Sequence, residues 1–434
     1  MSIIPVSIRN LYHKAQAILA IRRFGHPGRA LKVIGITGTD GKTTTTHLVE
    51  SVLQHAGKST GVITTIGVRF GNEEAPTGLH VTTPHSSEVQ AYLRQMVDRD
   101  IEYAIIETTS HGLAQHRVLG VEYDVAVITN ITSEHLDYHK TYDKYRSDKG
   151  LLFKNLATSW KKKGIPKVAI LNLDDASYDY LSQFSADRYL SYSIRESDAS
   201  VIATNIKITQ QGTSFSLCFD KKRTQVQLAL LGEFNVSNAL AAACVGISQG
   251  IDVKMIKQGL ETLKAIPGRM ERIENTRSFS VFVDFAHTPN ALQNALQLFR
   301  TILDQVSKKE RGLLILVFGC AGERDPFKRE EMGAIAGRYA DRVIITSEDP
   351  RNEDPLTIIK QIEGGLLKTS KRKGKEYWCI SDRKEAIAFA VSFAAKGDII
   401  DITGKGHEQS FCIKGVEYPW DDREVAREIL ETSL

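Results

Sequence analysis

The sequence lacks a cysteine pattern that could support disulfides or a zinc site. Its 434 residues include five cysteines, an odd number, and no C-x-x-C pair occurs. Free thiols are typical of a reducing compartment. The sequence also lacks an apolar run near the ~20 residues that a membrane span needs, and residues 1–32 lack the apolar core and cleavage site of a signal peptide. We therefore predict a soluble, cytoplasmic protein with no membrane span.

An excess of charge of one sign is missing as well. The chain has 56 Lys and Arg against 52 Asp and Glu, a net charge of +4, and no long basic run. Nothing in this balance favours nucleic acid as a partner. We interpret the short clusters Lys161-Lys162-Lys163 and 371–373 as solvated loop charges, the usual place for short charge runs. With 42% hydrophobic residues, the composition is that of a globular protein.

Three apolar runs in the first half of the chain predict buried parallel strands. Each run ends in polar residues, as a strand of an open α/β sheet does. The runs are 31–37, 102–108 and 123–130. Ligands bind at the carboxyl ends of the strands in such sheets. We therefore expect Lys42-Thr43, Glu107 and Asn130 to face one crevice.

Later segments predict a second sheet. The alternation between 200 and 230 predicts a small antiparallel patch, and the stretch 265–273, with Pro and Gly, indicates a linker. Beyond it, apolar runs alternate with helical stretches at 279–285, 313–319, 341–347, 376–380 and 398–404. We predict an α/β protein. Its expected parts are an N-terminal helical extension (1–30), a P-loop-type central ATPase domain with a mostly parallel sheet (31–266) and a C-terminal Rossmann-like doubly wound α/β domain (267–434).

The stretch GITGTDGKTTTT (35–46) lies between a predicted strand and a predicted helix, which is the position of a phosphate-binding loop. Gly38 and Gly41 let the backbone approach an anion, and the N-terminus of the following helix favours one. Lys42 adds a positive charge, and the hydroxyl of Thr43 can bind Mg²⁺. The stretch therefore predicts a nucleotide site.

Two residues of this stretch depart from the usual P-loop, G-x-x-x-x-G-K-[ST]. Ile36 stands where the first glycine is expected, and Asp40 lies where phosphates would approach. A carboxylate beside phosphates costs Coulomb energy unless a metal or a lysine offsets it. Asp40→Asn is the direct test of whether the acid matters.

Two further segments carry candidate chemistry. Glu107 follows an apolar strand, so it is a candidate Mg²⁺ ligand, and the alternative is a carboxylate that caps a nearby helix. Residues 130–150 place His135 and His139 among carboxylates, which could indicate zinc. This stretch contains no cysteine and no H-E-x-x-H spacing, which favours a magnesium or phosphate environment instead. Taken alone, Lys149 reads as a surface lysine of a helix.

Nine motifs in a fixed order resemble the Mur ligases of peptidoglycan synthesis, most of all the tripeptide-synthetase (MurE) type. The resemblance covers the chain from about residue 31 to its C-terminus, and the looser glycine spacing at 35–43 belongs to it. The motifs are GTDGKTTT, ETTSHGLAQHR, TNITSEHLDYH…DKGLLF, LGEFNVSNALAA, IPGRME, VDFAHTPNAL, FGCAGERDPFKR, SEDPRNEDP and GKGHE.

The resemblance implies an ATP-dependent ligase that needs Mg²⁺. ATP would phosphorylate a substrate carboxylate, and the amine of an amino acid would attack the acyl phosphate to form an amide. The implied metal and catalytic residues are Thr43, Glu107, His135 and Lys149, the last as a carbamate, with Lys42 on the phosphates. The implied nucleotide-binding residues are Gly38, Thr39, Asp40, Gly41, Lys42, Thr43, Thr44, Asn235, Asn238, Arg269 and Asp284.

The resemblance also implies small-molecule substrates, a UDP-muramoyl-dipeptide and an amino acid. Residues for the first are Thr82, Thr83, Thr109, Gln115 and Arg117. Residues for the second are Arg324, Glu348, Asp349, Pro350, Arg351, Gly404 and Glu408. In the family, a D-N-P-R motif marks enzymes that add meso-diaminopimelate. Arg351 is kept here and suits a carboxylate, but Asp349 replaces the Asn, which leaves L-lysine as an alternative.

The resemblance fails at the N-terminus. The family carries an N-terminal uridine-binding domain, and here only about 30 residues precede the first predicted strand, too few for a separate core. The central domain alone, or a partner protein, would then hold the muramoyl-peptide. Two alternatives remain: a Mur-type ligase acting on a poly-glutamate or folate-like acid, and a non-catalytic, nucleotide-gated binding subunit. The joint presence of Lys42, Glu107, His135 and Lys149 argues against the last.

Overall fold

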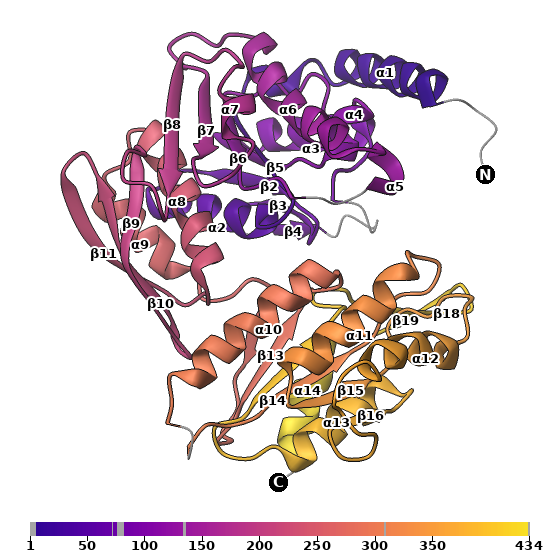
Figure 1. Ribbon diagram of the computed structural model, residues 1–434. Coiled ribbons are helices and arrows are strands. Elements are labelled where there is room, and N and C mark those ends of the chain that lie inside the picture. The colour runs from indigo at the N-terminus through magenta and orange to yellow at the C-terminus, as the bar shows by residue number, and fades with distance from the viewer. Residues whose placement is uncertain (1–5, 72, 76–81, 133–135, 308–309, 433–434) are drawn as a thin grey trace. The chain divides into compact units, whose positions relative to one another are not determined.

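The computed structural model describes residues 6–432 except 72, 76–81, 133–135 and 308–309. The chain divides into two compact units, Met1–Lys264 and Ala265–Leu434, drawn in indigo to rose and in orange to yellow (Figure 1). Each unit has its own sheet and its own core. None of the helices in the described ranges is long and apolar enough to cross a membrane.

The first unit alternates strands and helices before it turns to consecutive strands. In chain order it contains α1 (Val6–Arg23), η1 (Pro27–Arg29), β1 (Lys32–Thr37), α2 (Lys42–His55), β2 (Thr60–Ile63), β3 (Val68–Phe70), β4 (Glu73–Ala75), α3 (Ser86–Asp98), β5 (Tyr103–Glu107), α4 (Ser110–Ala114), β6 (Val125–Ile128), α5 (Leu136–His139), α6 (Tyr142–Thr158), β7 (Val168–Asn172), α7 (Tyr178–Leu181), β8 (Arg188–Ser193), β9 (Val201–Thr209), β10 (Gly212–Phe219), β11 (Lys222–Leu228), α8 (Glu233–Ser248) and α9 (Val253–Thr262).

The described strands of this unit form one sheet in the order β11-β10-β9-β8-β7-β6-β1-β5-β2-β3-β4. Its centre is parallel: β1 lies between β5 and β6, with Ile36 opposite Glu107 and Thr37 opposite Ile128. Helices α3 and α6 bury apolar residues against alternate positions of these strands, and α2 and α8 also contact the sheet. The predicted mostly parallel α/β sheet is confirmed, and its register aligns the polar ends of three strands.

The antiparallel pairing predicted for 200–230 is confirmed. Strands β9, β10 and β11 pair antiparallel, but β8 pairs parallel with β9, so the three strands extend the main sheet. A β-bulge between Ser214 and Ser216 interrupts the β9–β10 register.

The second unit is the predicted doubly wound α/β fold. It contains β12 (Glu271–Ile273), β13 (Ser280–Asp284), α10 (Pro289–Asp304), β14 (Leu314–Phe318), α11 (Phe327–Tyr339), β15 (Arg342–Ile345), α12 (Pro355–Leu366), β16 (Tyr377–Cys379), α13 (Arg383–Phe393), β17 (Ile399–Thr403), β18 (Ser410–Ile413), β19 (Val416–Pro419) and α14 (Asp422–Thr432). The sheet order is β12-β13-β17-β14-β15-β16, parallel except for β12. The hairpin β18–β19 was not predicted.

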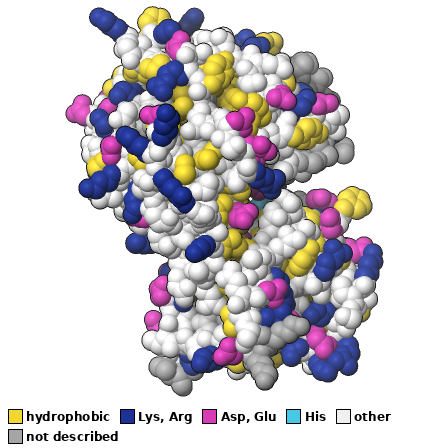
Figure 2. Space-filling model, turned by 60° about the vertical axis from the view of Figure 1, so that its left-hand side comes forward, with side chains coloured by type: hydrophobic (Ala, Val, Ile, Leu, Met, Phe, Trp, Pro, Cys, Tyr) yellow, Lys and Arg dark blue, Asp and Glu magenta, His cyan; other side chains and the backbone are white. Residues whose placement is uncertain are grey.

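One charge prediction was wrong. Lys162 is not a solvated loop residue, because its side chain is only 7% exposed and its Nζ contacts Asp124 Oδ2. Asp124 is also buried and accepts a hydrogen bond from Lys167 Nζ at 3.0 Å. Lys161, which precedes Lys162 in the sequence, is exposed. Elsewhere, as Figure 2 shows for one face, basic and acidic side chains both occur on the surface.

Candidate functional site

The loop between β1 and α2 is built from two glycines that no other residue could replace without strain. Gly38 and Gly41 have φ of +153° and +80°. A Cβ added at Gly38 would lie 1.8 Å from Thr129 Oγ1, and one added at Gly41 would lie 2.3 Å from Asn238 Oδ1. The loop therefore follows a path that depends on glycine for both its torsions and its close packing.

This loop fits a phosphate group. Gly41 caps α2 with no side-chain hydrogen bond, and the geometry of a helix leaves the N–H groups of its first turn without partners in the helix. Together with the positive end of the helix dipole they favour an anion. Lys42 Nζ donates to Thr39 O at 2.7 Å, so its charge lies at the same loop. Asp40 is exposed, where water screens its charge.

Residues that follow β6 or lie on α6 hydrogen-bond to the backbone of the loop. Asn130, at the end of β6, accepts from Asp40 N at 3.0 Å through Oδ1 and from Thr39 N at 2.8 Å through its backbone carbonyl. Lys149 is buried, donates to Gly38 O at 2.6 Å and lies 4.5 Å from the Tyr145 ring centroid. The interpretation of Lys149 as a surface lysine was therefore wrong, because α6 carries it under the phosphate loop.

Thr43 and Glu107 meet as predicted. Thr43 Oγ1 donates to Glu107 Oε2 at 2.9 Å, and Thr65 donates to the same carboxylate through N and Oγ1 at 3.2 Å each. The carboxylate is buried. Helix α4 is instead capped by Thr109, whose side chain accepts from Gly112 N, so the capping alternative for Glu107 is not supported. A carboxylate and a hydroxyl are the oxygen ligands that Mg²⁺ prefers, and the pair fits that ion.

His135 was predicted as the third residue around the metal and lies outside the described residues. Among the residues that are described, no group of three or more His, Cys, Asp or Glu side chains could hold a metal ion. A Mg²⁺ site here would thus be completed by hydroxyl, phosphate or water oxygens around Glu107 and Thr43.

Asn235 and Asn238 reach the loop from α8. Asn238 Oδ1 accepts from Thr45 Oγ1 at 3.2 Å, and Asn238 Nδ2 donates to Asn235 Oδ1 at 3.1 Å. Their place in a buried, alanine-rich helix lets α8 pack closely on α2. The two predicted asparagines therefore fix the helix start that carries the loop.

The predicted acceptor-binding residues form one hydrogen-bonded cluster beside Glu107. Thr83 Oγ1 lies 3.0 Å from Thr109 Oγ1 and donates to the Glu107 backbone carbonyl at 3.2 Å. Arg117 donates to Thr83 O at 2.8 Å and to Gln115 Oε1 at 2.8 Å. Thr82 joins it through Thr65, whose Oγ1 donates to Thr82 Oγ1 at 2.9 Å. Sequence reasoning missed Thr65, which follows no predicted strand end.

A buried Ser–His–Asp chain was also missed. His139 Nε2 lies 3.0 Å from Ser110 Oγ, and His139 Nδ1 lies 2.8 Å from Asp148 Oδ2. All three side chains are buried, so no substrate could reach Ser110 as a nucleophile. These hydrogen bonds join α4 to α6 and so connect the acceptor cluster to the helix that carries Lys149. His139 was visible in the sequence but had been considered only as a possible zinc ligand.

In the second unit, Arg269 and Asp284 lie near each other. Arg269 stacks over the Phe285 ring at 4.4 Å, and Asp284 accepts from Met270 N at 3.0 Å. Burial raises the pKa of Asp284, which the charge of Arg269 partly opposes.

Residues 348–351 and 404–408 form a charged network. Asp349 accepts from Lys405 Nζ at 2.7 Å and from Cys412 N at 3.1 Å, and Lys405 also donates to Glu408 Oε2 at 3.0 Å. Burial lowers the pKa of Lys405, but the carboxylates of Glu408 and Asp349 more than offset this, and the pKa is raised. Lys405 was not predicted, although it belongs to the GKGHE motif.

The remaining residues of this network present unused polar groups. Glu348 is buried, burial raises its pKa, and its Oε2 has no hydrogen-bond partner among the described residues. Gly404, at φ +115°, leaves room for it, since an added Cβ would lie 2.7 Å from that oxygen. Arg351 Nε is likewise buried without a partner in the described parts of the chain. Arg324 is exposed. Pro350 O packs against Gly322.

Asp401 lies in the middle of β17 with neither carboxylate oxygen hydrogen-bonded among the described residues. Its side chain is fully buried between Phe282 of β13 and Leu316 of β14. Burial raises the pKa of Asp401 well above its usual value, and the charge of Asp284 raises it further.

Asp401→Asn should therefore raise the free energy of unfolding at neutral pH and change it little in acid. The folded protein holds the Asp401 proton to a higher pH than the unfolded chain, whose aspartate pKa is about 3.9. Below that pH both states are protonated, so ionisation of Asp401 does not affect the free energy of unfolding. As pH rises from there through the raised pKa, the unfolded chain loses its proton more readily than the folded protein, so the free energy of unfolding falls. Urea unfolding over a pH series measures it, with the exposed Asp179→Asn as control. Parallel curves for wild type and Asp401→Asn would contradict the assignment.

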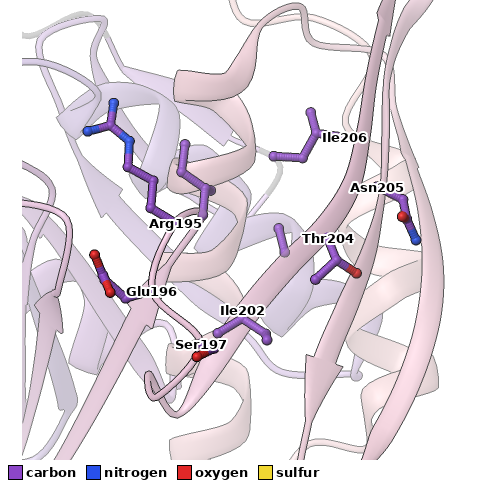
Figure 3. A pocket seen from close by; sticks show the side chains of 9 residues that line it. Arg195, Glu196, Ser197, Ile202, Thr204, Asn205 and Ile206 are labelled. Carbon is purple, nitrogen blue, oxygen red and sulfur yellow. The ribbon is translucent and has the colours of Figure 1, made fainter.

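Two hollows lie elsewhere in the first unit. One, of about 360 Å³, is lined by 194–197 and 202–206, where β9 follows the turn that carries Arg195 and Glu196 (Figure 3). A second, of about 540 Å³, is lined by Asn205, Lys207, Ser214, Ser216, Arg223 and Gln225. No predicted site residue lines either one, so the candidate site rests on the hydrogen-bonded geometry at the strand ends.

The sequence matches a known protein family. Residues 36–246 match the Mur ligase middle domain, and residues 268–406 match the Mur ligase glutamate ligase domain. The chain is 42% identical over 99% of its length to UDP-N-acetylmuramoyl-L-alanyl-D-glutamate--2,6-diaminopimelate ligase of Bacillus velezensis, of which it covers 84%.

Solved structures agree. A UDP-N-acetylmuramoyl-L-alanyl-D-glutamate--2,6-diaminopimelate ligase superposes with a TM-score of 0.66 at 32% identity, over 93% of this chain and 79% of that one. Folylpolyglutamate synthase of Mycobacterium tuberculosis reaches 0.71 over 90% and 92%, but at 18% identity it shares only the fold. The two matching domain models and the 42% identity to the Bacillus velezensis ligase over 99% of the chain show that this chain belongs to the Mur ligase family.

Proposed function

We propose that this Mur ligase uses ATP and Mg²⁺ to join meso-diaminopimelate to a UDP-N-acetylmuramoyl-L-alanyl-D-glutamate-like acceptor. The observation that carries the proposal is the meeting of three groups at one sheet edge: the phosphate loop, the Thr43–Glu107 pair and the acceptor cluster around Thr83. The substrate named for the Bacillus velezensis relative supports the acceptor and the amino acid. Five free cysteines agree with work in a reducing cytoplasm.

The chain's own groups would serve phosphoryl transfer mainly by position and charge. The first N–H groups of α2 and the ammonium of Lys42 would hold the nucleotide phosphates and offset the charge that develops on them. Thr43 and Glu107 would hold Mg²⁺, and the ion would supply positive charge to offset that of the phosphates. Lys149 would keep Gly38 in place, and as a carbamate it would add an anionic oxygen ligand.

The acceptor cluster would present the substrate carboxylate to this loop. Arg117 and Gln115 are hydrogen-bonded to each other, and Thr83 is hydrogen-bonded to the Glu107 backbone. A carboxylate held by these side chains would therefore be fixed relative to the Thr43–Glu107 pair. Such positioning of two reactants is worth several orders of magnitude in rate. The amine of the amino acid would then attack the carbonyl carbon of the acyl phosphate, and the C–N bond would form as the C–O bond to phosphate breaks, with release of phosphate and of a proton from the nitrogen.

The charge network of the second unit favours diaminopimelate over lysine. Asp349 is already paired with Lys405 at 2.7 Å, which makes its carboxylate less available to the side-chain ammonium of lysine. The buried Nε of Arg351, without a partner among the described residues, is instead a donor suited to a carboxylate. Diaminopimelate has a distal carboxylate that lysine lacks. The Asn-to-Asp change thus does not by itself point to lysine.

The amino-acid panel is the test of this function. The purified protein is incubated with ATP, Mg²⁺ and UDP-N-acetylmuramoyl-L-alanyl-D-glutamate, with meso-diaminopimelate, L-lysine or L-ornithine added in turn. We expect phosphate release and a product of the matching mass only with diaminopimelate. Product with lysine alone would overturn the role given to Arg351. Turnover only with a folate or poly-glutamate acceptor plus glutamate would overturn the muramoyl acceptor, and no turnover with any pair would remove the ligase proposal.

A further inference from the structure

Helix α1 exposes a row of large apolar side chains. Leu11, Tyr12 and Leu19 are 70%, 61% and 66% exposed, and Ile18 is 38% exposed. At 100° per residue, these four positions and Ala15 share one side of the helix. Single exposed apolar residues are ordinary, but a contiguous set on one helix face marks an interaction surface. We call this set the outer face of α1.

The outer face is not needed to hold α1 on the protein. The opposite side carries Ala17, Ala20 and Ile21, which are buried, and α1 contacts α3. Ile21 packs so closely on Gly120 that a Cβ there would lie 2.4 Å from Ile21 Cδ1. Among the described residues, α1 therefore has one apolar side packed on its own unit and a second apolar side that is exposed.

The charged residues of α1 itself are all of one sign. Helix α1 contains Arg9, Lys14, Arg22 and Arg23 and no acidic residue, and the first acid in the chain is Asp40. Lys14, Arg22 and Arg23 are exposed. Burial lowers the pKa of the nearby His116, and the positive charges of Lys14 and His13 lower it further, so this histidine adds no charge at neutral pH.

We propose that the outer face of α1 docks the protein on a membrane surface that carries anionic phospholipid headgroups. A helix with exposed Leu and Tyr, flanked by Lys and Arg and free of acids, lies in the interface with its apolar side chains among the acyl chains and its cations at the headgroups. Tyr12 suits the boundary, since its ring is apolar and its hydroxyl is polar. The inference concerns α1 alone and does not depend on the proposed ligase reaction.

Vesicle binding tests the proposal. The full-length protein is sedimented with vesicles of pure phosphatidylcholine and with vesicles that also contain phosphatidylglycerol, at low and high salt. We expect binding to the anionic vesicles, weakened by salt because the headgroup attraction is screened. Leu11→Asp combined with Leu19→Asp should reduce binding by at least about tenfold, and Arg22→Gln combined with Arg23→Gln should reduce binding and weaken its salt dependence, since Arg9 and Lys14 remain.

The controls separate docking from folding and from self-association. Leu356→Asp combined with Leu367→Asp changes exposed leucines of the second unit, at and next to α12, and should leave vesicle binding unchanged. Thermal melting of each variant in buffer should match wild type. No binding to anionic vesicles, equal binding to pure phosphatidylcholine, or a wild-type dimer in sedimentation that the Leu11/Leu19 variant disperses would each overturn the proposal, the last by assigning the face to a second copy.

Discussion

Lys42→Ala is expected to reduce phosphate release by about 10²–10³-fold or more while leaving the protein folded. Lys42 is the lysine of the phosphate loop, and its hydrogen bond goes to the backbone of the same loop, to Thr39 O. Charge that develops on transferring phosphates must be offset at the moment of reaction, and the loss of one such donor costs on this scale. The measurement is phosphate release with ATP, the muramoyl acceptor and diaminopimelate, beside a thermal melt of the same sample.

Lys58→Ala is the matched control for this prediction. Lys58 is a partly exposed lysine in the segment that follows α2, paired with Glu102 at 3.5 Å, and its loss should leave turnover unchanged. If Lys42→Ala keeps wild-type turnover, the loop is not the phosphate site. If it loses activity together with its melting transition, the residue is structural.

Asp124→Asn is expected to cost about 3–5 kcal/mol of unfolding free energy. The change keeps the size of the side chain but leaves the ammonium groups of Lys162 and Lys167 buried without a counter-charge. Burial already lowers the pKa of Lys162, while Asp124 acts to raise it, so removing Asp124 favours a neutral Lys162. The measurement is urea unfolding at neutral pH.

Lys161→Ala gives the surface reference for the same charge cluster. Lys161 is 69% exposed and pairs with Asp187 at 2.9 Å, and exposed pairs contribute roughly 0–1 kcal/mol. A cost for Asp124→Asn no larger than that of Lys161→Ala would mean that water reaches the buried cluster and that Lys162 is in effect solvated.

Local pattern was enough to predict much of the site. The apolar runs before Thr37 and Glu107 and around Ile128 fold as parallel neighbours, so the residues just beyond their ends had to converge. For this reason the sequence pattern alone brings Thr43 and Glu107 to one crevice and places Asn130 beside the loop. The pattern does not predict the hairpin β18–β19 or the joining of β9 to β8, because edge pairing depends on which strand is free in space.

Three lysines show where local pattern fails. Lys149 and Lys162 read as surface charges, and Lys405 drew no attention, yet all three are buried and bonded. A lysine is buried only when a distant chain segment supplies its acceptor: Gly38 for Lys149, Asp124 for Lys162 and Asp349 for Lys405. These partners lie many residues away, so periodicity around the lysine says nothing of them.

The sequence by itself therefore determined the α/β class, the glycine-dependent phosphate loop and the strand ends that converge on it, because apolar periodicity and backbone torsions are local properties. Only the tertiary structure decided which charged side chains are paired with other residues inside the protein and which remain available to a ligand. Asp349 is the clearest case: its carboxylate is a specificity determinant when read as sequence, and one half of a buried ion pair once Lys405 is folded against it, since a charge can be neutralised only by a group that the fold brings within reach.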